Sequence, residues 1–262
     1  MEPTTGTEKT VKDKLIDVST AVQTAVEASE RSPHATVLPV TKRIKKGLVM
    51  EAYDHGERHF GENYFQSLKR RATKLPSDIK WHFIGHLQSN KANGLVAIEN
   101  LYVIETVDSI KLAKKLDKAC ENIQRKLNIF LQVNSSGEAS KSGFPPEDVH
   151  GAAETVMNEC PNLNLLGLMS IGKVGDKEGF ELMYNLKKEI CEKYDLESDK
   201  FELSIGTSAD YEDAIVHGGA TEVRVGTQIF GKRTDKNMNT SSEEDEARDN
   251  AAEKKEEDAK EK

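Results

Sequence analysis

The sequence lacks the features that mark disulfide-rich, zinc-binding, secreted and membrane proteins. Only three cysteines occur in 262 residues, Cys120, Cys160 and Cys191, and no two of them form a CxxC pair. This odd number and wide spacing exclude a disulfide framework and a paired-cysteine zinc site, and they fit a reducing compartment. The first residues contain neither an apolar signal core nor an arginine-rich amphipathic stretch. No segment approaches the roughly 18 apolar residues of a membrane span, so we expect a cytoplasmic protein that binds no membrane.

Several catalytic and binding motifs are also missing. There is no HExxH and no carboxylate cluster with metal-ligand spacing, so the sequence predicts no metal site. There is no GxSxG, which excludes that kind of serine nucleophile. The formal net charge is −8, but residues 234–262 hold 11 acidic and 6 basic residues and account for −5 of it. The remaining chain is nearly neutral and has no concentrated basic face, so we expect no nucleic-acid partner.

Residues 234–262 differ from the rest of the chain in composition. They are charged, rich in serine and asparagine, and almost without apolar residues. Such a segment cannot bury enough surface to offset the entropy lost on ordering. We therefore expect one folded domain over residues 1–233 and a disordered, solvated tail over 234–262.

The folded part alternates between two kinds of apolar pattern. An amphipathic helix is predicted at about 9–30, where apolar residues recur at helical spacing, and Pro33 follows it. After this helix, short apolar runs typical of buried parallel strands alternate with helical patterns. The predicted strands are 36–40, 59–60, 81–84, 101–106, 129–133, 163–171, 201–205 and 222–225, and the predicted helices are 48–55, 62–73, 88–97, 109–124, 146–158, 177–194 and 209–217.

Eight strands that alternate with helices predict an α/β fold, a (β/α)₈ TIM barrel. The alternative is an open doubly wound sheet, but the first strand-to-helix turn lacks the GxGxxG of the dinucleotide-binding form. Asp108 and Ser109 are predicted to cap a helix, and Gly56 and Gly218 to end helices. Pro39 removes a backbone donor from the first strand, so we expect an irregularity there.

Three strand ends carry residues suited to a phosphate-bearing aldehyde. Lys42 follows the first strand, where partial desolvation would favour the neutral amine that attacks an aldehyde. Two glycine motifs, SIGTS ending at Ser208 and VRVGT ending at Thr227, follow strands 7 and 8, where barrels commonly bind phosphate. Gly206 and Gly226 would allow close approach of an anion, and the helix predicted at 209–217 would direct its positive end toward it. Each motif alone is an ordinary turn, and the prediction depends on both together.

Further polar residues lie in or beside the predicted strands. Arg224 lies between two valines of the last strand, so its guanidinium needs a buried partner. A ring nitrogen and a buried carboxylate remain open as that partner. Asn63, His82 and His86 are polar residues near strand ends, where a barrel places function. For each histidine a core or capping role remains the alternative.

The ordered motifs of the chain resemble those of a known family. They are TK42, YDHG56, FGENY64, WHFIGHLQSNK91, QVNSSGEASKSG143, GLMSIG172, SIGTSADYEDAI215 and EVRVGTQIFG231. Over about 200 residues they are similar to the pyridoxal-phosphate homeostasis proteins, which are single-barrel relatives of the alanine racemase N-terminal domain. The WHFIGHLQSNK and VRVGTxIFG segments are long enough to be specific.

The resemblance implies a cofactor and a set of residues that hold it. The cofactor is pyridoxal 5′-phosphate (PLP), bound as an internal aldimine by Lys42. The other implied cofactor-binding residues are Ser208, Gly226 and Thr227 at the phosphate, Arg224 at the pyridine nitrogen, and Asn63 and Met169 along the pocket. The family implies storage or delivery of PLP without established turnover, with apo forms of PLP enzymes as candidate partners.

The chain departs from the family pattern at three places that leave these positions intact. Arg43-Ile-Lys-Lys46 replaces the usual x-Lys-Pro after the lysine, Ile205-Gly-Thr-Ser208 replaces Met-Gly-Met-Ser, and Pro39 replaces a small strand residue. The first change argues against a transfer role for a second lysine beside Lys42.

Three functions remain to be distinguished: a non-catalytic PLP carrier, a PLP enzyme such as an amino-acid racemase, and a phosphate-binding barrel enzyme in which Lys42 is incidental. Racemases of this type add a C-terminal β domain, for which the segment after the last strand leaves no room. An arginine beside the ring nitrogen also weakens the electron sink that a racemase needs. We therefore expect a monomeric carrier.

Overall fold

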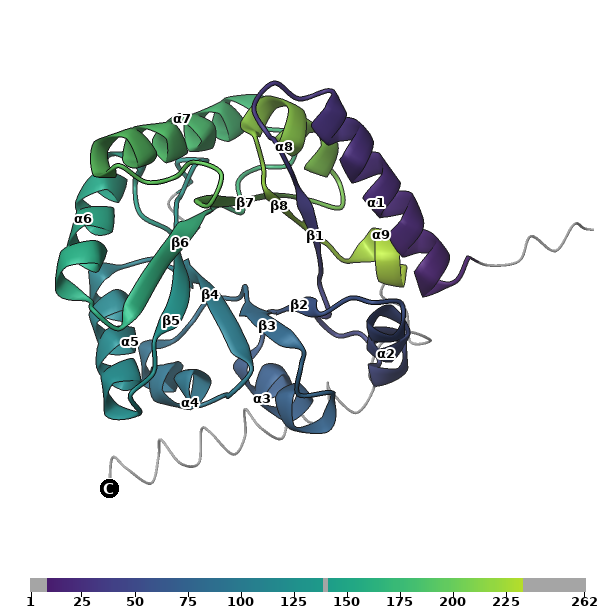
Figure 1. Ribbon diagram of the computed structural model, residues 1–262, viewed down its shortest axis with the longest axis horizontal. Coiled ribbons are helices and arrows are strands. Elements are labelled where there is room, and N and C mark those ends of the chain that lie inside the picture. The colour runs from purple at the N-terminus through teal and green to yellow at the C-terminus, as the bar shows by residue number, and fades with distance from the viewer. Residues whose placement is uncertain (1–8, 139–140, 233–262) are drawn as a thin grey trace, which may run out of the picture.

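Eight parallel strands form a nearly closed barrel in the computed structural model, which describes residues 9–138 and 141–232. Figure 1 looks along the barrel, with the strands around the centre and the helices outside. The strands pair in the order β1-β8-β7-β6-β5-β4-β3-β2. Their bounds are β1 (Thr36–Pro39), β2 (His59–Glu62), β3 (Lys80–Phe83), β4 (Leu101–Val107), β5 (Leu127–Gln132), β6 (Leu163–Met169), β7 (Glu202–Thr207) and β8 (Glu222–Val225). The (β/α)₈ barrel expected from the sequence is confirmed, and the doubly wound sheet is excluded.

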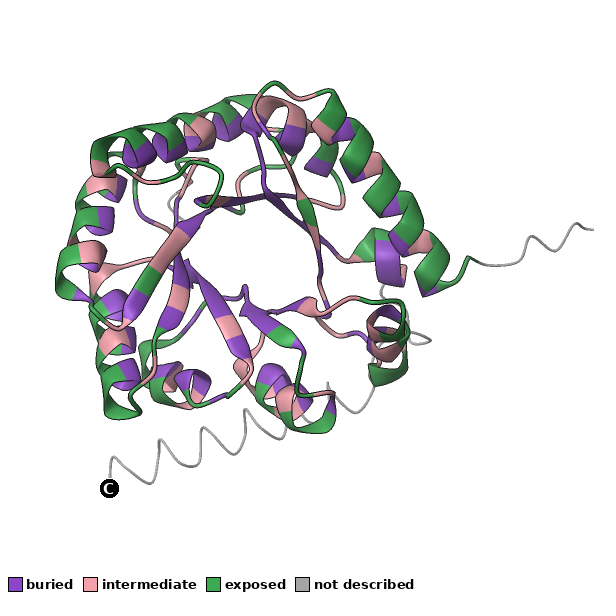
Figure 2. Ribbon diagram, viewed as in Figure 1, coloured by how far each residue is buried: buried purple, intermediate pink, exposed green. Residues whose placement is uncertain are grey.

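Helices surround the sheet and turn their buried faces toward it, as the burial colours of Figure 2 show. The α-helices are α1 (Val11–Glu27), α2 (Lys46–Asp54), α3 (Phe65–Lys74), α4 (Ala92–Val96), α5 (Ile110–Asn122), α6 (Val149–Glu159), α7 (Lys177–Tyr194), α8 (Tyr211–Gly218) and α9 (Thr227–Phe230); two 3₁₀ turns are η1 (Ser89–Lys91) and η2 (Pro146–Asp148). The expected opening helix is α1, which lies outside the barrel against α8, α9 and β1. The predicted tail, 234–262, lies outside the described residues.

The predicted helix ends are partly correct. Ser109 caps α5 by accepting a hydrogen bond from the Leu112 N–H at 3.3 Å. Gly56 follows α2 with a φ of +121°, a conformation that favours glycine. The stop of α8 is Gly219 and not Gly218, because Gly219 takes the left-handed conformation (φ +62°) and Gly218 is still helical. The short helix α9 was not predicted, since four residues carry no periodic signal.

The barrel is weakest along the edge between β1 and β2, which we call the seam. Within the described residues this edge has the isolated bridge Val40–Gly61, and the Thr41 N–H donates to the Gly61 carbonyl at 2.8 Å. Pro39 lies on this edge. The N–H groups of Thr36 and Val40 donate to β8, so the alternating backbone directs position 39 toward β2. The expected irregularity is therefore the open seam, while β1 and β8 pair in register through Pro39.

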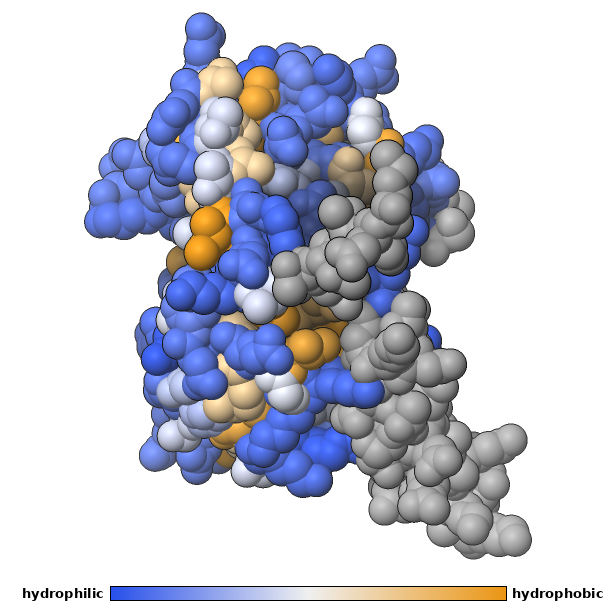
Figure 3. Space-filling view, turned by 90° about the vertical axis from the view of Figure 1, so that its right-hand side faces the viewer, coloured by the Kyte–Doolittle hydropathy of each residue, from blue (hydrophilic) through white to orange (hydrophobic). Residues whose placement is uncertain are grey.

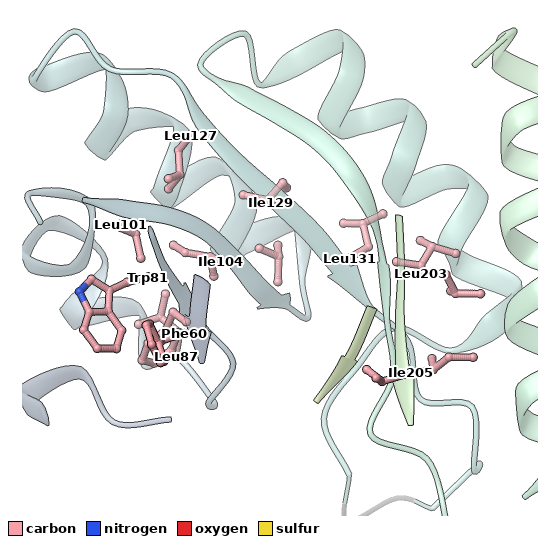
Figure 4. Close-up of a cluster of buried hydrophobic side chains, with 14 of the residues drawn as sticks. Phe60, Trp81, Leu87, Leu101, Ile104, Leu127, Ile129, Leu131, Leu203 and Ile205 are labelled. Carbon is pink, nitrogen blue, oxygen red and sulfur yellow. The ribbon is translucent and has the colours of Figure 1, made fainter. Parts of the chain in front are cut away.

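The main core fills the layer between the sheet and the helices. Leu127, Ile129 and Leu131 alternate along β5 and join the large apolar cluster of Figure 4. Within the barrel a second, small cluster contains Val103, Phe130 and Met169. The barrel interior is filled by these side chains and by buried polar residues. Its two open ends are therefore the places where a ligand can bind.

The face of the molecule shown in Figure 3 is predominantly polar. Figure 3 shows the side that includes α1 and α2, where hydrophobic residues form small and separate patches. No helix of the described chain is both long and apolar enough to cross a bilayer.

The three cysteine thiols should be unreactive in the folded protein. Cys120, Cys160 and Cys191 are free thiols with at most 5% exposure. Burial raises all three thiol pKa values, that of Cys120 to about 11. Because the thiolate is the reactive form, we expect almost no reaction with Ellman's reagent at pH 8, and three equivalents after denaturation. Rapid modification of one thiol in the native protein would contradict this.

Candidate functional site

A cavity of about 380 Å³ lies at the end of the barrel where the strands finish. All seven residues predicted to bind the cofactor line it: Lys42, Asn63, Met169, Ser208, Arg224, Gly226 and Thr227. Sequence reasoning missed the other lining residues, which are Val40, Ile84, Ile171, Thr207 and Ala209. The predicted residues lie on β6 and β8 or just beyond the ends of β1, β2, β7 and β8, so the closed barrel accounts for their meeting.

Lys42 lies two residues beyond the Val40 bridge and is half-buried. Its Nζ is 5.1 Å from the centre of the Tyr64 ring. The turn that carries it is fixed by Arg71, which donates to the Thr41 and Ile44 carbonyls and pairs with Glu62 at 3.1 Å. Burial lowers the pKa of Arg71, and the Glu62 carboxylate opposes that shift. Tyr64 belongs to the FGENY motif, so the signal for it was present in the sequence.

Asn63 follows β2 and is positioned by its neighbours on both sides. Its backbone N–H donates to Glu62 Oε1 at 2.8 Å. Its side-chain Oδ1 is buried and has no hydrogen-bond partner among the described residues. A Cβ at Gly85 would lie 1.8 Å from the Asn63 carbonyl oxygen, so only glycine fits the loop after β3 beside it. The unpartnered amide oxygen makes Asn63 a candidate ligand contact.

Arg224 is buried on β8 and makes several hydrogen bonds. Nη1 donates to the Ser204 carbonyl at 2.7 Å and to Ser204 Oγ at 2.9 Å, while Nη2 donates to the Ser170 carbonyl at 2.8 Å. Burial lowers its pKa, and the charges of Glu105 and Glu222 oppose this. The sequence left a buried carboxylate and a ring nitrogen open as partners of Arg224, and its position is compatible with both. Carboxylates lie beyond Ser204, and the guanidinium also borders the cavity.

The loops after β7 and β8 are tied together on one wall of the cavity. The Gly226 N–H donates to Ser208 Oγ at 3.1 Å, and Gln228 Nε2 donates to the Ser208 carbonyl at 2.7 Å. A Cβ at Gly226 would come within 3.3 Å of the Val40 carbonyl oxygen, which explains the close approach of β8 to β1. Three residues of this wall carry side-chain hydroxyls: Thr207, Ser208 and Thr227.

Two expectations about the phosphate end are wrong. Gly206 does not approach the cavity: it has a φ of +88°, and an added Cβ would meet Ala214 of α8 at 2.6 Å. The helix predicted from residue 209 begins at Tyr211, with Asp210 at its N-cap and Glu212 and Asp213 in its first turn. These carboxylates already occupy the positive end of the helix dipole.

The two histidines singled out from the sequence lie elsewhere. His82 is buried in the barrel and borders a second cavity at the end where the strands begin. His86 is exposed on the rim, with Nδ1 3.4 Å from Asp108. Neither lines the cavity of Lys42.

Comparison with known proteins identifies relatives along most of the chain. The model of the alanine racemase N-terminal domain family matches residues 16–234. The pyridoxal phosphate homeostasis protein of Homo sapiens is 41% identical over 232 residues, covering 82% of this chain and 84% of that protein. The protein of the same name from Pseudomonas aeruginosa is 39% identical over 228 residues, covering 86% and 96%.

Solved structures agree in fold. PipY of Synechococcus elongatus PCC7942, in a structure with PLP bound, is 30% identical with a TM-score of 0.69, covering 84% of this chain and 100% of PipY. The alanine racemase of Streptomyces coelicolor A3(2) has a TM-score of 0.60 at 18% identity, covering 81% and 58%, and shows a shared fold alone. The chain therefore belongs to the alanine racemase N-terminal domain family and, within it, to the pyridoxal phosphate homeostasis proteins.

Proposed function

We propose that this protein binds PLP in the Lys42 cavity, holds it covalently through the Lys42 amine, and serves to store or deliver it without turnover. One observation carries the proposal. The Lys42 side chain, the buried Arg224 guanidinium and the hydroxyl-rich β7 and β8 loops all line one cavity of about 380 Å³. The names of the relatives and the PLP-bound form of PipY support the same ligand.

The residues fit this ligand in chemical type. When bound, PLP supplies an aldehyde that takes up a primary amine, together with a pyridine ring and a phosphate. Lys42 offers the amine, while the Ser208 and Thr227 hydroxyls offer donors for the phosphate, and the Gly226 N–H holds Ser208 Oγ in place. Arg224 offers N–H donors to the ring nitrogen, and Met169 offers an apolar surface. The unpartnered Asn63 Oδ1 is an acceptor that a donor on the ligand would satisfy.

The lining of the cavity favours a carrier over a racemase. A racemase needs an acid-base group on each face of the substrate carbon. Apart from Lys42 and Arg224, the described residues that line the cavity carry no ionisable side chain. A guanidinium beside the ring nitrogen opposes protonation of that nitrogen, which weakens its capacity to stabilise a carbanion. Apo forms of PLP enzymes as recipients, a monomeric state and a cytoplasmic location remain part of this proposal.

Reductive trapping tests the proposal. We expect that protein incubated with PLP and then reduced with borohydride carries one pyridoxyl group, which peptide mass spectrometry locates on Lys42. Lys42→Ala should abolish the label. Lys46→Ala is the matched control, because Lys46 is exposed and donates to the Lys74 carbonyl away from the cavity, so it should label fully. A label on another lysine, or none, would remove Lys42 from its assigned role.

An assay of alanine racemisation separates the carrier from the enzyme. We expect no turnover above that of Lys42→Ala when PLP-loaded protein is incubated with L-alanine and the D-isomer is measured. Rapid turnover that depends on Lys42 would establish the racemase alternative.

A further inference from the structure

A second cavity, of about 590 Å³, opens at the opposite end of the barrel, where the strands begin. Residues of α1, the loop before β2 and several strands line it. Its walls include His59, His82, Glu202 and Glu222. The proposed binding of PLP uses none of these residues, and this end of a barrel usually contributes stability alone.

His82, Glu105 and Glu222 converge beside this cavity from β3, β4 and β8. His82 Nδ1 lies 2.8 Å from Glu105 Oε1 and 3.3 Å from Glu222 Oε2. The three side chains are at most 9% exposed. Their nitrogen and oxygen atoms lie within 4.8 Å of one another, while His82 and Glu222 also border the cavity and so give the cluster access to solvent.

We propose that His82, Glu105 and Glu222 bind one divalent cation of the zinc class, with the cavity as its route of entry. An imidazole nitrogen and carboxylate oxygens are ligands that Zn²⁺ accepts. Metal–ligand bonds of about 2.0–2.2 Å in tetrahedral geometry place neighbouring ligand atoms roughly 3.3 Å apart. The separation of His82 Nδ1 from Glu222 Oε2, 3.3 Å, matches that value, whereas its 2.8 Å separation from Glu105 Oε1 is that of a hydrogen bond and would lengthen when a metal replaces the proton.

Neighbouring side chains contact the outer atoms of the cluster and orient it, as they do around the ligands of a metal ion. Ser204 Oγ lies 2.7 Å from Glu105 Oε2 and 2.9 Å from Glu222 Oε1. This hydroxyl has a single proton and donates to the far oxygen of one carboxylate at a time, while the near oxygens of both lie toward His82. On the other side of the imidazole, His82 Nε2 lies 2.8 Å from His59 Nδ1. Hydrogen bonds of this kind to the outer atoms of ligating residues are typical of metal sites.

The charges around the cluster also favour a cation. Two buried carboxylates lie side by side, and Glu202 borders the same cavity. The guanidinium of Arg224 donates to Ser204 Oγ and supplies one positive charge beside the two carboxylates. Without a metal, the carboxylates must share a proton to lower their repulsion. A divalent cation would compensate both charges at once, and the convergent near oxygens provide its ligands.

His82 was singled out from the sequence, but the cluster could not be predicted, because its members lie at positions 82, 105 and 222. Metal motifs recognised by spacing place ligands on one helix or loop, whereas these three meet only when β3, β4 and β8 close the barrel. The expectation of no metal, drawn from spacing, therefore does not address it.

Titration of the chelator-dialysed, untagged protein with ZnCl₂ tests the site by calorimetry. We expect one equivalent to bind, and Glu222→Gln or His82→Gln to weaken binding at least tenfold. His150→Ala is the matched control: His150 pairs with Glu189 on the surface, and its loss should leave the stoichiometry unchanged. Circular dichroism would establish that each variant is folded.

Co²⁺ gives a second readout that needs no variant. We expect one equivalent of CoCl₂ to produce the intense visible bands of a four-coordinate site in the wild-type protein, and ZnCl₂ to remove them. Absence of saturable zinc binding together with a six-coordinate Co²⁺ spectrum would show that the cluster holds a shared proton only. Equal zinc affinity in wild type and Glu222→Gln would likewise overturn the proposal. PLP trapping at Lys42 is measured separately, so failure of one proposal leaves the other intact.

Discussion

Replacing Arg224 by alanine is expected to lower the free energy of unfolding by about 3–5 kcal/mol and to release bound PLP. The side chain is 6% exposed, and its guanidinium donates to two carbonyl groups and to Ser204 Oγ. Its loss would leave the Ser170 and Ser204 carbonyls without these donors and remove the positive charge that opposes the buried carboxylates. Urea denaturation and equilibrium dialysis of PLP would measure the two effects.

Two companion variants separate charge from geometry at Arg224. Arg224→Lys keeps the charge but loses the planar fork, so we expect an intermediate loss of stability. Arg224→Ala combined with Glu105→Gln removes an uncompensated carboxylate and should recover part of the loss. These measurements need a chelator, so that metal binding does not contribute. If Arg224→Ala retains both the stability and the visible spectrum of the PLP-loaded wild type, Arg224 has neither role.

Replacing Gly85 by alanine is expected to cost about 3 kcal/mol in the free energy of unfolding. The new Cβ would lie 1.8 Å from the Asn63 carbonyl oxygen and 2.6 Å from its carbon. Because the obstacle is backbone, the connection between β2 and α3 must shift, and Asn63 must move with it. PLP affinity should therefore fall together with stability, as measured by thermal unfolding and by dialysis.

Gly151→Ala is the matched control for this prediction. Gly151 lies inside α6, and nothing lies within 4 Å of its added Cβ. Alanine stabilises a helix interior by roughly 0.5–1 kcal/mol relative to glycine, so this variant should be slightly more stable than wild type. Wild-type stability in Gly85→Ala would show that the loop after β3 can relax.

Periodicity predicted the architecture because each element has its own apolar signal. The continuous runs of β4 and β5 are typical of parallel strands covered on both faces, and α7 was predicted with its observed bounds. Short elements failed: α9 has four residues, and β2 extends to Glu62 because pairing with β3 includes its polar end. The stop of α8 was misplaced by one residue, since two adjacent glycines are equivalent until backbone angles are known.

The candidate site, like the fold, could be predicted from the sequence only in part. Strand order places Lys42, Ser208 and Gly226 at one barrel end, so topology alone brings them together. The orientation of Gly206 toward α8 depends on a left-handed backbone that the sequence does not specify. The place of His82 depends on which way β3 faces, and its first residues, Lys80 and Trp81, do not mark the inner side by polarity.

The seam between β1 and β2 links the proposed ligand to the dynamics of the barrel. Lys42 follows one of its strands and Asn63 the other. Regions with few backbone hydrogen bonds open at the lowest free energy, so amide exchange should be fastest here. A molecule that binds both residues would connect the two strands across the seam. By linkage, the binding free energy of such a molecule adds to the free energy needed to open the sheet at the seam. Ligand binding and local unfolding therefore oppose each other.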